Sequence, residues 1–196
     1  EPSRCLSGID ISNLDSLEGV FRIVRPQAVI NCIGIIKQLR EASDPMLSLS
    51  INSMLPHRVA RLAHLVGARM IHISTDCVFS GRRGGYTEDD ISDAEDLYGR
   101  TKFLGEVHEG HCVTLRTSII GRELETKSGL IEWFLTQRGK TIRGYQRALY
   151  TGFTTHELSR IISRVLFLNT EISGLWQVSS NAISKFELLQ MAKLYL

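Results

Sequence analysis

The sequence predicts an α/β protein with a parallel, doubly wound sheet, because strand-like segments alternate with helix-like ones. The strand-like segments are short, apolar and rich in β-branched residues, as buried parallel strands are. They lie at residues 4–9, 28–34, 69–74, 111–116 and 174–178, and a further short strand is expected at 141–143. This alternation predicts helices on both faces of one sheet.

Helix start signals stand between these strands and after the last of them. Asn13 and the Asp44-Pro45 pair are favoured at helix N-termini, and two Ser/Thr-x-x-Glu capping boxes begin at Thr154 and Ser184. Helices are expected at residues 12–24, 44–66, 96–109, 127–138, 155–168 and from 184 onward.

The pattern also changes along the chain, since helical signals dominate after residue 121. We therefore expect residues 1–120 to form a sheet domain and residues 121–196 to form a smaller, partial, mostly helical lobe. Within that second part, residues 155–180 are expected to pack back on the sheet.

The composition excludes several classes of protein. A chain of 196 residues with 43% hydrophobic and 22% charged residues is typical of a globular protein. Its net charge of +2 predicts neither nucleic-acid nor membrane binding, and no apolar run is long enough to span a membrane. The four cysteines have no paired spacing, and the six histidines have no metal-ligand spacing. We expect a cytoplasmic protein with reduced thiols and no metal.

The segment from Ser74 to Glu106 concentrates the chemically useful residues. Thr75 ends a predicted strand, where ligands of α/β sheets bind, and Tyr98 and Lys102 lie one helical turn apart. A phenol has a reference pKa of about 10, and a cation one turn away is expected to lower it. A phenol, an ammonium and a hydroxyl facing one crevice suit the reduction of a carbonyl group or its reverse. The plainer interpretation is a surface helix that carries a Tyr and a Lys.

The same segment resembles a known family. It reads Ser-Thr-Asp-Cys-Val-Phe-Ser-Gly at 74–81, Gly-Tyr-Thr-Glu at 85–88 and Tyr-Gly-Arg-Thr-Lys-Phe-Leu-Gly-Glu at 98–106. Together these motifs closely resemble the extended short-chain dehydrogenase/reductases, and within them the dTDP-4-dehydrorhamnose reductase group. Cys77 stands where that group usually has Tyr, on the substrate side.

The resemblance implies a Rossmann-like fold, NADPH or NADH as the cofactor, and a nucleotide-linked 4-keto-6-deoxy sugar as the substrate. The implied catalytic residues are Tyr98, Lys102, Thr75 and Asp76. The implied cofactor-binding residues are Asp10, Asn31, Cys32, Ile33, Gly34, Ser74, Tyr98, Lys102 and Thr117. The implied substrate-binding residues are Val78, Phe79, Arg116 and Tyr150, and Asn52 is implied as a support for the active-site strand.

Two of these assignments have plainer explanations from the residues alone. Asp10 is better explained as a capping or turn residue. Residues 31–34 are explained as well by a simple strand-to-loop turn as by a cofactor contact.

No Gly-x-Gly-x-x-Gly pattern, which would bind a pyrophosphate, occurs in the sequence. The resemblance therefore implies an internal fragment of a longer enzyme, without the first strands of the sheet.

Two alternatives to a reductase remain open. One is a nucleotide-sugar epimerase or dehydratase, although Asp76-Cys77 does not match the Asp-Glu pair of dehydratases. The other is a non-catalytic regulatory or binding subunit. Assembly of the protein into a homodimer also remains open.

Overall fold

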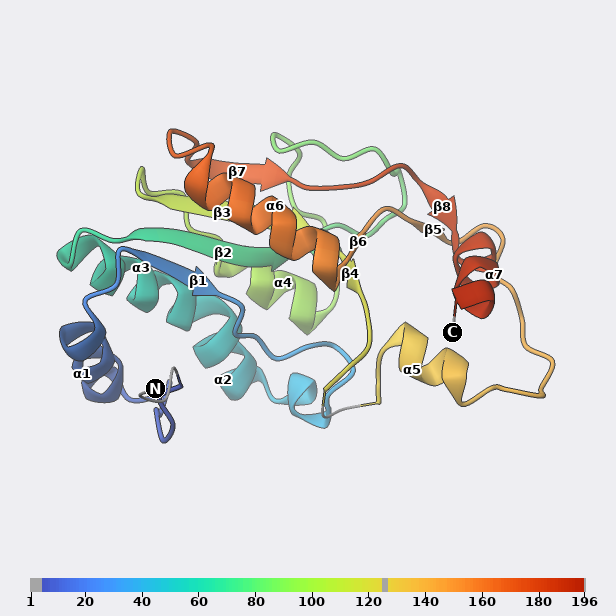
Figure 1. Ribbon diagram of the computed structural model, residues 1–196, viewed down its shortest axis with the longest axis horizontal. Coiled ribbons are helices and arrows are strands. Elements are labelled where there is room, and N and C mark those ends of the chain that lie inside the picture. The colour runs from blue at the N-terminus through green and yellow to red at the C-terminus, as the bar shows by residue number, and fades with distance from the viewer. Residues whose placement is uncertain (1–4, 125–126, 196) are drawn as a thin grey trace.

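A four-stranded parallel sheet forms the centre of the protein (Figure 1), in a computed structural model that describes residues 5–124 and 127–195. Its strand order is β1-β2-β3-β7, which confirms the parallel sheet expected from the sequence. At the carboxyl ends of the two central strands, Thr75 lies opposite Thr117. The strands are β1 (Ala28–Asn31), β2 (Arg69–Thr75), β3 (Cys112–Thr117) and β7 (Gly174–Gln177).

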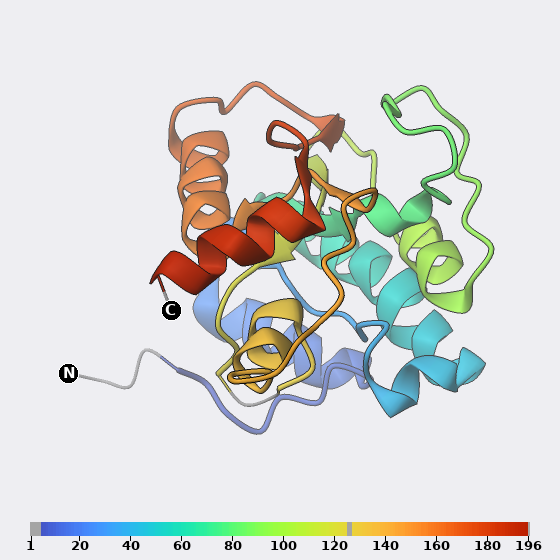
Figure 2. The same ribbon diagram turned by 90° about the vertical axis from the view of Figure 1, so that its right-hand side faces the viewer.

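Helices cover both faces of this sheet. Leu17 and Phe21 of α1 join Leu55 and Val59 of α3 in the core on one face. On the other face, α6 packs through Val165 and its neighbours. Figure 2 shows α6 on the opposite side of the sheet from α2, α3 and α4. The helical segments are α1 (Leu14–Val24), η1 (Arg40–Ser43), α2 (Pro45–Ser48), η2 (Leu49–Met54), α3 (Leu55–Leu65), η3 (Asp76–Val78), α4 (Leu97–Leu104), α5 (Leu130–Leu135), α6 (Thr155–Phe167) and α7 (Lys185–Tyr195).

The predicted long helix before β2 is present, and it contains a π-helical segment, η2. Asp44 caps it by accepting hydrogen bonds from the backbone N–H groups of Met46 and Leu47, as expected from the sequence. Pro56 has no N–H and its ring crowds the preceding turn. The π segment ends just before Pro56, with the Leu55 N–H donating to the Ser50 carbonyl. The long helix is thus locally widened just before Pro56.

Small elements of the second part lie beyond the carboxyl ends of the sheet strands, where α5 and α7 stand in Figure 1. The Ser184–Glu187 capping box is complete, with each residue accepting a hydrogen bond from the other's backbone N–H. Two short ladders complete this part, β4 (Ile119–Ile120) with β6 (Phe153–Thr154) and β5 (Leu149–Tyr150) with β8 (Ile183–Ser184).

Some sequence-based boundaries are wrong. Residues 5–9 form no strand, and residue 4 lies outside the described residues. A strand needs a paired neighbour, and β1 is an edge of the described sheet. The predicted strand at 141–143 is also absent. Helix α4 ends at Leu104, where the N–H groups of Gly105 and Glu106 donate to the Lys102 and Phe103 carbonyls in a tighter turn.

His72 lies fully buried in the middle of β2. Its Nδ1 lies 3.1 Å from Asn31 Nδ2, and among the described residues its Nε2 has no hydrogen-bond partner. Burial lowers the pKa of His72 to about 3, with the positive charges of Lys102 and His57 acting in the same direction. The native protein therefore holds this imidazole neutral.

This burial predicts a pH dependence of stability. Below pH 6.5, the reference pKa, the unfolded chain binds a proton at His72 that the native state binds only near pH 3. Stability is therefore lost as the pH falls, by about 1 kcal/mol between pH 7 and about pH 5.5. Urea unfolding at the two pH values should show this loss. The exposed control His156→Gln should keep this loss of stability, whereas in His72→Gln the loss should be smaller by about 1 kcal/mol. An equal loss in both variants would show that His72 does not cause the pH dependence.

Candidate active site

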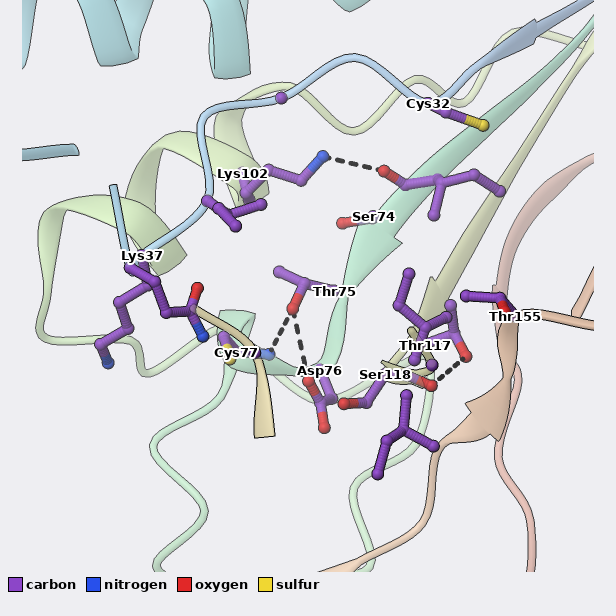
Figure 3. Close-up of a pocket in the computed structure, with 18 of the residues that line it drawn as sticks. Cys32, Lys37, Ser74, Thr75, Asp76, Cys77, Lys102, Thr117, Ser118 and Thr155 are labelled. Atoms are coloured by element: carbon purple, nitrogen blue, oxygen red, sulfur yellow. Dashed lines mark hydrogen bonds between the residues drawn. The ribbon is translucent and has the colours of Figure 1, made fainter. Parts of the chain in front are cut away.

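A cleft of about 440 Å³ opens at the carboxyl ends of the central strands (Figure 3). Its walls come from the loop after β1, the end of β2, helix α4, and the segment after β3. The second part of the chain closes one side through Gly129, Leu130, Tyr150 and Thr155. Ligands of open α/β sheets bind at this position.

Thr75 sits where β2 ends and η3 begins. Its Oγ1 accepts a hydrogen bond from the Cys77 N–H at 3.1 Å and donates one to Asp76 Oδ1 at 3.3 Å (Figure 3). A hydroxyl has one rotatable O–H, so Thr75 can donate to Asp76 or to another oxygen in the cleft. Burial raises the pKa of Asp76, so the cleft wall disfavours its charged form.

Helix α4 brings Tyr98 and Lys102 into the same cleft. Asp96 caps the helix by accepting a hydrogen bond from the Gly99 N–H at 2.8 Å. A Cβ at Gly99 would lie 2.2 Å from the Cys77 carbonyl oxygen, so only glycine allows α4 to approach the turn after β2 this closely. The Gly that follows Tyr98 thus sets the distance between the helix and Thr75.

The electrostatics of the pair differ from the sequence-based expectation. Lys102 Nζ donates to the Ile73 carbonyl oxygen at 2.8 Å (Figure 3). Burial lowers the pKa of Lys102 to about 8, and the nearby Glu106 carboxylate acts against this. Burial raises the pKa of Tyr98 to about 12, opposed by the Thr75 hydroxyl. The expected lowering of the Tyr98 pKa by Lys102 is wrong for this structure, because desolvation of the phenol outweighs any effect of the ammonium.

The loop after β1 lines the cleft with Cys32, Ile33 and Gly34. Asn31 itself is buried below the cleft, where its Oδ1 accepts the Ile33 N–H at 3.1 Å. Asn52 supports the same loop, because its Oδ1 accepts the Ile35 N–H at 2.8 Å and its Nδ2 donates to the Ile35 carbonyl at 3.1 Å. Both asparagines therefore shape the loop and do not line the cleft.

Three other expected site residues do line the cleft: Ser74, Thr117 and Tyr150. Burial raises the pKa of Tyr150 to about 12. No sequence pattern indicates Lys37 or Arg122, which also line the cleft and form ion pairs with Asp96 and Glu132, respectively. Such pairs form between distant segments and leave no local pattern.

The structure does not bring Asp10, Val78, Phe79 or Arg116 to the cleft wall. Asp10 accepts hydrogen bonds from the backbone and side chain of Ser12, as the turn interpretation implies. Val78 is fully buried, and the Phe79 ring stacks on Tyr86. The buried Arg116 guanidinium pairs with Glu106.

The family of this chain follows from a match to a known protein family. The family described as "RmlD substrate binding domain" matches residues 4–135 of this chain. The chain belongs to this family. The resemblance to the dTDP-4-dehydrorhamnose reductase group inferred from Ser74 to Glu106 is thereby confirmed.

Individual relatives match about half of the chain. A dTDP-4-dehydrorhamnose reductase of Streptomyces griseus is 32% identical over 99 residues, which are 50% of this chain and 33% of that protein. Methionine adenosyltransferase 2 subunit beta of Xenopus laevis is 33% identical over 102 residues, which are 52% of this chain and 30% of that protein. The matched segment thus spans about a third of the length of each relative.

A solved structure extends the likeness over nearly the whole chain. The dTDP-4-dehydrorhamnose reductase of Bacillus anthracis in complex with NADP has a TM-score of 0.82 and 26% identity. The alignment covers 95% of this chain and 68% of that one. The Rossmann-like α/β fold is therefore confirmed. No helix among the described residues has the length and apolar character needed to cross a membrane.

Proposed function

We propose that this RmlD-family chain carries the active site of an NAD(P)H-dependent reductase. Its substrate would be the keto group of a nucleotide-linked 4-keto-6-deoxy sugar, in deoxysugar or cell-surface polysaccharide biosynthesis. The observation that carries the proposal is the convergence of Thr75, Tyr98 and Lys102 on one cleft at the carboxyl ends of the strands. A relative named dTDP-4-dehydrorhamnose reductase supports the choice of substrate class.

The residues present fit a nicotinamide dinucleotide. A Cβ at Gly34 would lie 3.3 Å from Asn52 Oδ1 and 3.8 Å from Lys102 Nζ, so glycine keeps the space beside the ammonium open. Lys102 and Thr117 offer donors for ribose hydroxyls, and the Bacillus anthracis relative is a complex with NADP. When bound, reduced NADPH or NADH supplies the hydride that reduces a carbonyl carbon.

The side chains of the cleft then have distinct roles. Tyr98 gives its proton to the substrate oxygen, and its raised pKa of about 12 keeps that proton in place at neutral pH. Thr75 turns its O–H from Asp76 toward the same oxygen and orients it. Lys102, while it is charged, stabilises the phenolate that forms on Tyr98. Asp76, whose pKa is raised by burial, assists Thr75 as a second polar group.

A non-catalytic subunit is the second candidate function. The similarity to methionine adenosyltransferase 2 subunit beta favours it, since that relative is named as a subunit of another enzyme. Such a subunit needs the fold and a docking surface, and it does not need proton transfer from Tyr98. Turnover and partner binding therefore separate the two candidates.

Cofactor binding is the first test of the proposal. Quenching of the fluorescence of Trp133 and Trp176 by NADPH and by NADH would be measured on this chain and on the chain extended along its reading frame. Lys102→Met is expected to weaken binding about tenfold, because a charged contact is lost. Lys193→Met, an exposed lysine on α7, is the matched control and should bind like the parent. Absence of binding in both chains would favour the subunit.

A further inference from the structure

Glu106 follows helix α4 and lies in a buried polar cluster that no catalytic step uses. Its Oε1 accepts hydrogen bonds from Ser74 Oγ and from Arg116 Nε, each at 2.8 Å. Its Oε2 accepts a third from Arg116 Nη2 at 2.8 Å. The side chains of Arg116 and Glu106 are only 2% and 0% exposed, so this bidentate pair is shielded from water.

The three partners of this cluster come from the three elements that build the active site. Ser74 precedes Thr75 on β2, Arg116 precedes Thr117 on β3, and Glu106 is four residues after Lys102. The end of β2 is tied to the helix at a second point, where Lys102 Nζ donates to the Ile73 carbonyl. Two adjacent residues of one strand are thus bonded to two residues at the end of one helix.

We propose that Glu106 is a positioning residue: held by Arg116, it fixes the end of β2 against α4 and so sets Lys102 and Thr75 at their working separation. The inference deepens the proposed reductase function, on which its kinetic part rests. Glu106 acts through Ser74 and Lys102 and does not line the cleft itself.

Electrostatics give Glu106 a second effect on Lys102. Burial is the main cause that lowers the pKa of Lys102, and the carboxylate of Glu106 is the largest opposing influence. The other titratable groups near Lys102 are Tyr98, one turn away on α4, Cys32, on the loop after β1, and His72, on β2. Cys32 acts on Lys102 in the same direction as Glu106. Removing the Glu106 charge should therefore favour neutral Lys102.

The charge effect can be measured without turnover. The chain has six lysines, and labelling their Cε atoms with carbon-13 allows the Lys102 resonance to be followed as the pH rises. The parent signal should titrate near pH 8. In Glu106→Gln the midpoint should fall by about one unit, the smallest shift expected from losing a close opposite charge. Glu95→Gln, which breaks the exposed ion pair with Arg82, is the matched control and should leave it unchanged.

Two further variants keep the test decisive. Glu106→Gln leaves Arg116 as an unpaired buried cation, so the double variant Glu106→Gln with Arg116→Gln serves if the single variant does not fold. Its Lys102 midpoint should also fall. Glu106→Asp keeps the charge and shortens the reach by one methylene, so it should keep the midpoint while kcat falls about tenfold at an unchanged KM for the sugar.

Each outcome bears on Glu106 separately from the function of the protein. An unchanged Lys102 midpoint in the folded Glu106→Gln and double variants would overturn the inference, whether or not the protein is a reductase. A lowered midpoint with full kcat in Glu106→Asp would overturn the positioning role and leave only a charge effect. Absence of turnover in the parent chain would count against the reductase, while the Lys102 titration would still decide whether Glu106 controls Lys102.

Discussion

Replacing Tyr98 by Phe is expected to lower kcat about a thousandfold, because the variant has no proton to give to the substrate oxygen. The ring still fills its place beside Thr75, since only the hydroxyl is removed. The affinity for NADPH or NADH should therefore stay within about twofold of the parent, as uniform binding is untouched. Steady-state kinetics with a nucleotide-linked 4-keto-6-deoxy sugar, together with cofactor titration, would measure both quantities.

The control for this variant is Tyr195→Phe, the same substitution at an exposed residue of α7. It should leave kcat and cofactor affinity unchanged. Turnover by Tyr98→Phe at the parent rate would remove Tyr98 from the chemistry, and a large loss of cofactor affinity would mean that the substitution disturbed the fold of the cleft.

Gly105→Ala is expected to destabilise the protein by about 3 kcal/mol. A Cβ at this position would lie 1.9 Å from the Asn52 carbonyl oxygen and 3.2 Å from Pro56 Cγ. Neither the η2 backbone nor the proline ring can give way easily, so α4 must move away from the long helix. For a chain of this size, the melting temperature should fall by roughly 6–12 °C.

Gly110→Ala is the matched control for the steric effect. A Cβ there would meet no heavy atom within 4 Å, so its stability should stay within about 0.5 kcal/mol of the parent. Thermal unfolding of both variants would be followed by circular dichroism. Equal melting temperatures for the two variants would mean that α4 does not pack on η2 as closely as the structure has it.

The parts of the site that lie within one helix or at the end of one strand could be predicted from the sequence. Tyr98 and Lys102 share one helix, so a four-residue spacing was enough to place them on the same face. Thr75 follows an apolar run, which marked it as the end of a buried strand. The Asp44 and Ser184 caps were likewise visible, because a helix N-terminus is decided by a few neighbouring residues.

Long-range packing decided what the sequence could not predict. The family resemblance implies that Arg116 contacts the substrate, but the fold brings Glu106 against it and buries both side chains. The pKa of Tyr98 depends on desolvation by its surroundings, which the spacing to Lys102 does not reveal. The motif includes a glycine at position 99, but only the structure shows why. A side chain there would collide with the Cys77 carbonyl oxygen.

Hydride transfer is the most direct measurement of what this cleft does. The protein, as this chain and extended along its reading frame, would be incubated with NADPH or NADH deuterated at the transferable position and with a nucleotide-linked 4-keto-6-deoxy sugar. Mass spectrometry of the sugar should find one deuterium at the former keto carbon with the parent, and about a thousandfold slower incorporation with Tyr98→Phe. Cofactor binding without deuterium transfer to any keto sugar offered would contradict the reductase and point to a binding subunit.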